Sequence, residues 1–111
     1  MKPVYKDAAR PEEERVKDLL SCMTLEEKFA QMRMIVQIDR LLKEQSFSKA
    51  AVAKELEHGI GASYSPTYLD PKVLNQFQKY LMEETRLGIP LLMMGESLHG
   101  IMSTNATVFP Q

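Results

Sequence analysis

Apolar residues recur at helical spacing in the first third of the chain. Three glutamates follow Pro11, an order that favours a helix start, because proline fits the first turn and acidic side chains interact well with the positive end of the helix dipole. The apolar positions that come next are Val16, Leu19, Leu20 and Met23. Thr24 and Glu27 then have the spacing of a capping box, which predicts a second helix. We therefore expect two amphipathic helices that meet end to end near residues 21–24.

The middle of the chain alternates between strand-like and helix-like segments. Segment 34–38, "MIVQI", fits either a buried strand or a continuation of the second helix, and its β-branched residues favour the strand. Segment 48–57 has a helix-forming composition, with Ser48 available as a cap and Gly59 where a left-handed residue ends a helix. Segment 59–65, "GIGASYS", then predicts a short strand whose glycines allow close backbone approach.

The last third repeats this helix-then-strand order. Asp70 and Pro71 combine a cap with a proline at the first helical position, and the apolar spacing after them predicts a helix as far as Arg86. Segment 89–94, "IPLLMM", shows no alternation of apolar and polar residues, which is typical of a strand covered by helices on both faces of a parallel sheet. The alternation of helix and strand predicts an α/β fold, either layered or a barrel.

The number of strands indicates that this α/β fold is incomplete in the chain. Two or three strand candidates are fewer than a parallel sheet usually contains, so we expect the whole fold to extend beyond these residues. Residues 1–111 would then form one segment of a single domain, because this length suffices for one modest domain and not for two.

Composition narrows the classes of partner. The formal net charge is -1, which leaves no basic field for nucleic acid or anionic lipid, so we expect neither nucleic acid nor membrane as a partner. Cys22 is the only cysteine, so an intrachain disulfide is impossible. The chain starts with polar and charged residues where a signal peptide has an apolar core, which predicts a cytoplasmic protein unless a leader has been removed.

The candidate chemistry lies in "LLMMGESLHGIM", where a run of apolar residues ends in Glu96 and His99. Functional groups of parallel α/β proteins collect at the carboxyl ends of the strands, and this pair lies at such an end. The Glu96 carboxylate could accept hydrogen bonds from vicinal hydroxyl groups. In the alternative interpretation Glu96 caps a turn and His99 is a partly buried histidine bonded to the backbone. Tyr64 and Tyr68 could line a cleft or pack on their own turn.

Other classes of site find little support in the residues. Glu96 and His99 resemble a metal pair at helical spacing, but no third ligand lies near them in the sequence, so we expect no metal site. The glycines at 59, 61 and 88 do not form a phosphate-binding loop, and we expect no cofactor.

Three separated motifs together carry a resemblance to a known family. The motifs are "PEEERVKDLLSCMTLEEKFAQM", "TRLGIPLLMMGESLHG" and "ATVFPQ". In this order they resemble the amino-terminal part of glycoside hydrolase family 3, the β-glucosidase and β-xylosidase family. The resemblance spans nearly the whole chain and is weakest over residues 33–53.

The resemblance implies a specific architecture and mechanism. The family folds as a (β/α)8 TIM-type barrel followed by an α/β sandwich domain, so residues 1–111 would be the amino-terminal part of the barrel and would pack against its remainder. The reaction is retaining hydrolysis of terminal β-linked sugars, and it needs a nucleophilic Asp and an acid/base residue. The resemblance places both after Gln111, so we expect no catalytic residue in this chain and no activity of the chain alone. The parent enzyme could be periplasmic or secreted, which leaves the location open.

The resemblance assigns one substrate contact to this chain. The acidic residue of the family's Asp/Glu-x-x-His-Gly motif binds hydroxyls of the sugar in the glycone subsite, and Glu96 occupies that position. His99 is implied to orient the loop beneath the site. The partner is then a carbohydrate, a β-linked oligosaccharide or glycoside. The alternative is a truncated, non-catalytic α/β scaffold or interaction module of the same ancestry.

Overall fold

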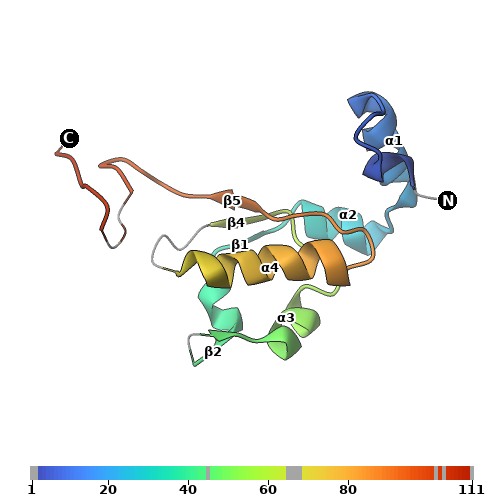
Figure 1. The fold of residues 1–111 in the computed structure, drawn as a ribbon. Helices are drawn as coiled ribbons and strands as arrows, with labels where there is room; N and C mark the ends of the chain where they lie inside the picture. Colours follow the sequence, from blue (N-terminus) through green and yellow to red (C-terminus); the bar gives the residue numbers. More distant parts are fainter. Residues whose placement is uncertain (1–2, 45, 65–68, 102, 104, 111) are drawn as a thin grey trace.

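A computed structural model describes residues 3–44, 46–64, 69–101, 103 and 105–110 of the chain. Its centre is a parallel sheet with the strand order β1 (Met34–Ile35), β4 (Ala62–Tyr64) and β5 (Leu92–Met94) (Figure 1). The central strand pairs in parallel with both neighbours, Ala62 facing Met34 on one side and Leu92 on the other. The α/β class with a parallel sheet is therefore confirmed, whereas the barrel stays a prediction.

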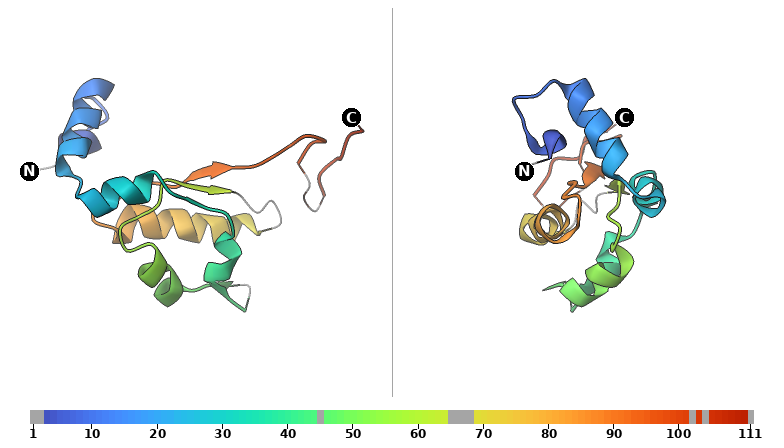
Figure 2. Two further views of the ribbon diagram at one scale, coloured as in Figure 1. Left: turned by 180° about the vertical axis from the view of Figure 1, so that it is seen from behind. Right: turned by 90° about the vertical axis from the view of Figure 1, so that its right-hand side faces the viewer.

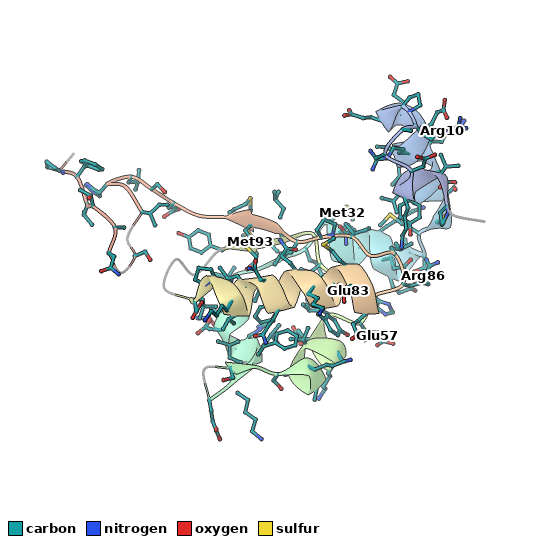
Figure 3. All side chains as sticks on the ribbon, viewed as in Figure 1. Arg10, Met32, Glu57, Glu83, Arg86 and Met93 are labelled. Carbon is teal, nitrogen blue, oxygen red and sulfur yellow. The ribbon has the colours of Figure 1, made fainter. Side chains whose placement is uncertain are left out.

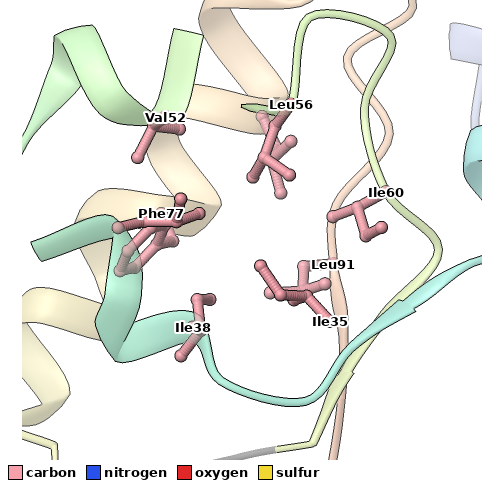
Figure 4. Close-up of a cluster of buried hydrophobic side chains, with 9 residues drawn as sticks. Ile35, Ile38, Val52, Leu56, Ile60, Phe77 and Leu91 are labelled. Atoms are coloured by element: carbon pink, nitrogen blue, oxygen red, sulfur yellow. The ribbon is translucent and has the colours of Figure 1, made fainter. Parts of the chain in front are cut away.

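Helices and a small hairpin pack together below the sheet (Figures 1 and 2). They are the 3-10 helix η2 (Ile38–Leu41), the hairpin of β2 (Leu42–Lys43) and β3 (Ser46–Phe47), α3 (Lys49–Glu55) and α4 (Pro71–Glu84). Their buried side chains meet those of the strands in one core, drawn in Figure 4: Ile35, Ile38, Leu41, Val52, Leu56, Ile60, Phe77, Leu81 and Leu91. The ring of Phe47 packs edge-on against Phe77, with ring centroids 5.1 Å apart. The hairpin thus joins α4 in the core.

The strands bury only one face in this structure, which corrects the expectation for segment 89–94. Leu91 is buried, whereas Leu92 is 62% exposed and Met94 is 41% exposed. Met34 and Val36 of the first strand region are exposed too. The alternation arises because the described helices of the core pack against the sheet from one side, so successive side chains point alternately to the core and to solvent.

The amino-terminal helices lie at one end of the molecule (Figure 1). They are η1 (Val4–Lys6), α1 (Glu12–Cys22) and α2 (Leu25–Gln31). The predicted capping box is confirmed: the Thr24 hydroxyl accepts from the Glu27 N–H, and the Glu27 carboxylate accepts from the Thr24 N–H. The helix predicted after Pro11 is confirmed as well, although it buries none of its residues fully. Its apolar stripe therefore contributes little to the core.

The amino-terminal caps predicted for the other two helices are confirmed. Ser48 caps α3 by accepting from the Ala51 N–H. Gly59 has the left-handed φ of +81°, but α3 already ends at Glu55, so Gly59 follows a turn after the helix, in which its N–H donates to the Leu56 carbonyl. Asp70 caps α4 by accepting from the Lys72 N–H at 2.8 Å. Segment 34–38 is a strand over its first two residues, after which η2 begins.

Gly61 is the point at which α2 reaches the sheet. Its N–H donates to the Ala30 carbonyl at the end of α2, and its own carbonyl accepts from the Leu92 N–H, both at 3.0 Å. A Cβ atom on Gly61 would lie 1.9 Å from the Gln31 carbonyl oxygen. Only glycine therefore lets the end of α2 and the start of β4 touch while β5 pairs on the other side.

The ion pair of Glu27 with Arg86 ties α2 to the segment that follows α4. The Arg86 Nε donates to one carboxylate oxygen of Glu27 at 2.9 Å, and its NH2 group contacts the other oxygen and donates to the Cys22 carbonyl. Figure 3 shows Arg86 at the end of α4 nearest α2. Glu27 is 6% exposed. The hydrogen bond from Arg86 lowers the pKa of Glu27, burial opposes this effect, and the Thr24 N–H adds to the lowering.

We expect Gly61→Ala to destabilise the chain strongly, on the order of 3 kcal/mol or more, because the new methyl group meets a backbone carbonyl that cannot rotate away. The matched control is Gly59→Ala, where the nearest atom is the end of the Gln31 side chain at 3.3 Å and the cost is the left-handed φ, about 1 to 2 kcal/mol. Urea denaturation measures both free energies of unfolding. Equal losses for the two variants would contradict the close approach.

We expect Glu27→Gln to lower the free energy of unfolding at pH 7 by about 1 to 3 kcal/mol, because charged hydrogen bonds to a buried carboxylate are lost. Since folding lowers the pKa of Glu27 from 4.5, its contribution is present above that value and is lost as the pH falls through the folded pKa. The difference between wild type and variant should therefore shrink in acid. The control is Glu55→Gln in the exposed pair with Arg40, expected within about 0.5 kcal/mol of wild type. A difference that is constant with pH would argue against this role of Glu27.

Candidate functional site

The candidate site lies at the carboxyl edge of the parallel sheet. Because the strands are parallel, β4 and β5 end at the same edge, and Tyr64 is the register partner of Met94. Glu96 follows two residues later, in the loop that leaves the edge, and its side chain is exposed. In Figure 1 this loop runs away from the helical end of the molecule. The structure therefore places Glu96 just beyond the end of a parallel strand, as the sequence predicts.

Glu96 changes the electrostatic environment of Tyr64 across this edge. Burial raises the pKa of the half-buried Tyr64 hydroxyl, and the hydrogen bond that it donates to the Glu96 carboxylate and the negative charge of that carboxylate raise it further. The Glu96 backbone acts on the pKa of Tyr64 in the opposite direction. The hydroxyl is therefore a neutral donor at ordinary pH, and the carboxylate keeps further lone pairs for other donors.

His99 bonds to the chain that follows it. Its Nδ1 lies 3.0 Å from the Phe109 carbonyl oxygen, so this nitrogen carries the donated proton, and the Phe109 N–H donates to the His99 carbonyl at 2.7 Å. Gly100 between them has a φ of +85°, and a Cβ there would lie 2.7 Å from the Thr107 carbonyl oxygen. His99 is thus a half-buried histidine bonded to the backbone, and it holds the loop after Glu96 against segment 107–109.

An apolar groove lies away from this edge. It has a volume of about 610 Å³ and lies between α1, α2 and the segment before β5. Its lining consists of Leu19, Leu20, Met23, Leu25, Lys28, Phe29, Gln31, Met32 and Ile89. A sugar needs several polar partners for its hydroxyls, and two polar side chains in an apolar lining match it poorly. The groove is therefore a surface for apolar side chains.

Two other kinds of site find no support in the part of the chain that the structure describes. No three His, Cys, Asp or Glu side chains of these residues are grouped as metal ligands would be. No helix among them is long and apolar enough to cross a membrane.

Sequence reasoning located Glu96 and considered Tyr64, but it missed the contact between them. The alternatives for Tyr64 were a cleft or its own turn, whereas the structure pairs it with Met94, two residues before Glu96, and Glu96 raises its pKa. The missing signal was the register of β4 with β5, which no local pattern reveals. Tyr68, the other tyrosine of that proposal, lies outside the described residues.

Comparison with known proteins finds relatives over nearly the whole chain. An inferred beta-xylosidase of Formosa agariphila is 36% identical over 113 residues, which cover 95% of this chain and 15% of the relative. Beta-glucosidase C of Emericella nidulans is 30% identical over 112 residues, which cover 96% of this chain and 18% of the relative. The chain thus spans less than a fifth of the length of these relatives.

No family model matches the chain. The relatives nevertheless carry the same two names that the three motifs suggested, and the similarity extends over about 95% of the residues. The predicted resemblance to glycoside hydrolase family 3 is therefore confirmed, and this chain is related over nearly all of its length to one segment of β-xylosidases and β-glucosidases.

Proposed function

We propose that this chain is a segment of a glycoside hydrolase that releases terminal β-linked glucose or xylose, and that Glu96 binds the sugar in the glycone subsite. The observation that carries the proposal is the position of Glu96, exposed at the carboxyl edge of a parallel sheet and within the "GESLHG" motif. The names of the relatives support the class of substrate. The substrate is then a β-linked oligosaccharide or glycoside.

The chemistry of a carboxylate suits this role. Two oxygens offer about four lone-pair sites, and an ionised acceptor makes hydrogen bonds roughly twice as strong as a neutral one. Adjacent hydroxyls of a pyranose can each donate to one oxygen. Among the described residues Glu96 takes part in no ion pair, so no cation competes with the sugar for the carboxylate.

The reaction itself needs groups beyond those proposed here. A retaining mechanism uses one carboxylate as nucleophile and a second as acid and then base, with their carboxyl groups roughly 5 Å apart. The resemblance implies that both follow residue 111 in the parent enzyme, with this segment as the opening part of the barrel. The role of residues 1–111 is then to build part of the barrel and to bind the glycone.

A second candidate function is a non-catalytic interaction module of the same ancestry. The apolar groove between α1 and α2 favours it, because an exposed apolar surface of this size often contacts another protein segment. A module would be monodisperse and would unfold cooperatively on its own, and the complete gene product would not hydrolyse glycosides.

We expect the complete gene product that carries residues 1–111 to release nitrophenol from aryl β-glucosides or β-xylosides, and the isolated 111-residue chain to release none. The physical reason is that the chain supplies a binding carboxylate without the two catalytic carboxyl groups. Absorbance at fixed protein concentration measures both rates. No turnover by the complete product on any such glycoside would refute the proposed hydrolase and favour the module.

We expect Glu96→Gln in the complete gene product to lower kcat/KM by about 30- to 150-fold, or about 2 to 3 kcal/mol, because charge-assisted contacts with sugar hydroxyls are lost. Steady-state kinetics measure the change. The control is Glu83→Gln on the exposed face of α4, where Figure 3 labels the residue, and this variant should keep the wild-type kcat/KM. Unchanged kinetics of Glu96→Gln on every glycoside that the enzyme cleaves would remove Glu96 from the subsite.

A further inference from the structure

We propose that the apolar groove between α1 and α2 is a docking surface, and that its occupant is an amphipathic helix of the same polypeptide from outside residues 1–111. The inference rests on one part of the proposed function, namely that this chain is a segment of a longer protein. It needs neither the glycone subsite nor hydrolysis, because the groove lies away from the carboxyl edge of the sheet.

The first wall of the groove is a helix that presents apolar side chains without burying them. α1 buries none of its residues, and Val16 and Leu20 of its apolar stripe are each more than half exposed. Figure 1 shows α1 apart from α3 and α4, which pack below the sheet. A stripe of apolar residues at helical spacing is typical of a helix face that packs on a neighbour. The described residues do not cover these two side chains.

The second wall carries a matching row of exposed apolar residues. Leu25, Phe29 and Met32 line the groove, and each is more than half exposed. Their spacing of four and three residues places them on one face of α2 and its carboxyl end. A groove walled by two helices suits a third helix, whose apolar residues at positions i, i+3 or i+4 and i+7 insert between the walls.

Polar bonds hold the two walls in place without an occupant. The Tyr5 N–H donates to the Asp18 carboxylate of α1, and the Tyr5 hydroxyl donates to the Leu87 carbonyl, both at 2.9 Å. The Arg86 side chain donates to the carbonyl of Cys22, the last residue of α1, at 2.7 Å. These bonds connect α1 to the segment that precedes β5. The groove is therefore preformed, and fewer groups have to be ordered when a partner docks.

The charge of the groove narrows the chemistry of its occupant. Lys28 is the charged residue among the described lining residues, and its side chain is exposed. It takes part in no ion pair with the residues that the structure describes. A helix with an apolar face and one acidic residue beside Lys28 would therefore complement the groove in both burial and charge.

The length of the relatives favours an occupant from the same polypeptide. The similarity covers 95% and 96% of this chain, so it includes α1 and α2, but it covers only 15% and 18% of the relatives. More than four-fifths of each relative thus lies outside the matched segment. A tethered segment has an effective concentration that can reach the order of millimolar, which favours it over a separate protein of equal affinity.

The first test measures the accessibility of the groove in the complete gene product. In a Cys22→Ser background we expect Leu20→Cys to react with a maleimide at least about tenfold more slowly than Ser21→Cys, because the occupant must open first. Leu20 lines the groove, whereas Ser21 is the next residue, is exposed and does not line it. Mass spectrometry of the labelled peptides measures both rates, which should become equal in urea. Equal rates in the native protein would overturn the proposal.

The second test identifies the occupant. Benzoylphenylalanine in place of Phe29 of the complete gene product should, on illumination, form a crosslink within one polypeptide to a peptide from outside residues 1–111. That peptide should carry apolar residues at helical spacing, and the same group in place of Ser21 should not capture it. A crosslink to a second copy or to a separate protein would overturn the proposal, and the separate protein is the partner expected of an interaction module. The absence of any crosslink from Phe29 would overturn it as well.

The outcomes separate this inference from the proposed function, because neither test measures turnover. If the complete gene product hydrolyses glycosides and Leu20→Cys reacts as fast as Ser21→Cys, the docking inference is wrong and the proposed function stands. If the groove is protected and crosslinks within the polypeptide while no glycoside is cleaved, the proposed hydrolase fails and the docking inference stands.

Discussion

The close approach of Gly61 to the end of α2 is the constraint on which the rest of the structure depends. The backbone of Gly61 bonds to Ala30 on one side and to Leu92 on the other, so a single residue joins a helix and two strands. The carbonyl of Gln31 occupies the space in which any other residue would place its Cβ atom. That approach lets α2 end against the start of β4, next to the bond from the Leu92 N–H that joins β4 to β5.

The register in turn decides what meets at the carboxyl edge. With Ala62 opposite Leu92, Tyr64 lies opposite Met94, and Glu96 follows Met94 in the loop beyond the same edge. A one-residue shift would turn the tyrosine to the opposite face of the sheet, because side chains alternate along a strand. The amino edge of the sheet, where the glycine lies, therefore sets the geometry of the candidate site at the other edge. At the amino edge, Gln78 of α4 also restrains the start of β5. Its side-chain amide exchanges two hydrogen bonds of 2.8 Å with the backbone of Leu91.

Local signals in the sequence predicted the elements well and their environment poorly. Thr24 with Glu27, Ser48 and Asp70 found the amino-terminal caps of three helices, because a cap depends on residues within one turn. The hairpin of β2 and β3 went unpredicted, since its four strand residues carry no marked pattern. Segment 89–94 was expected to be covered on both faces, and the structure exposes Leu92 and Met94. Composition of one strand cannot specify which neighbouring layers are present.

The same limit applies to the candidate site. Glu96 was found because a carboxylate at the end of an apolar run is visible in the sequence, and the resemblance then gave it a role. Neither the Tyr64 contact nor the Glu27–Arg86 pair was predicted, because the partners lie 32 and 59 residues apart and only the fold brings them together. Tyr64 lies at the end of β4 and Glu27 in the first turn of α2. Their partners, Glu96 and Arg86, lie on either side of β5 in the sequence.

These two long-range contacts do different work at opposite ends of β5. Glu27 is buried and charged, so the free energy lost by removing its carboxylate from water is offset only when Arg86 is in place. Correct docking of α2 therefore requires the pair. Tyr64 is neutral and half-buried, so it leaves the charge of Glu96 free for a ligand. A carboxylate matched by a cation stabilises the fold, whereas a carboxylate matched only by a hydroxyl retains the capacity to bind. That difference in partner is the physical reason to look for function at Glu96 and for stability at Glu27.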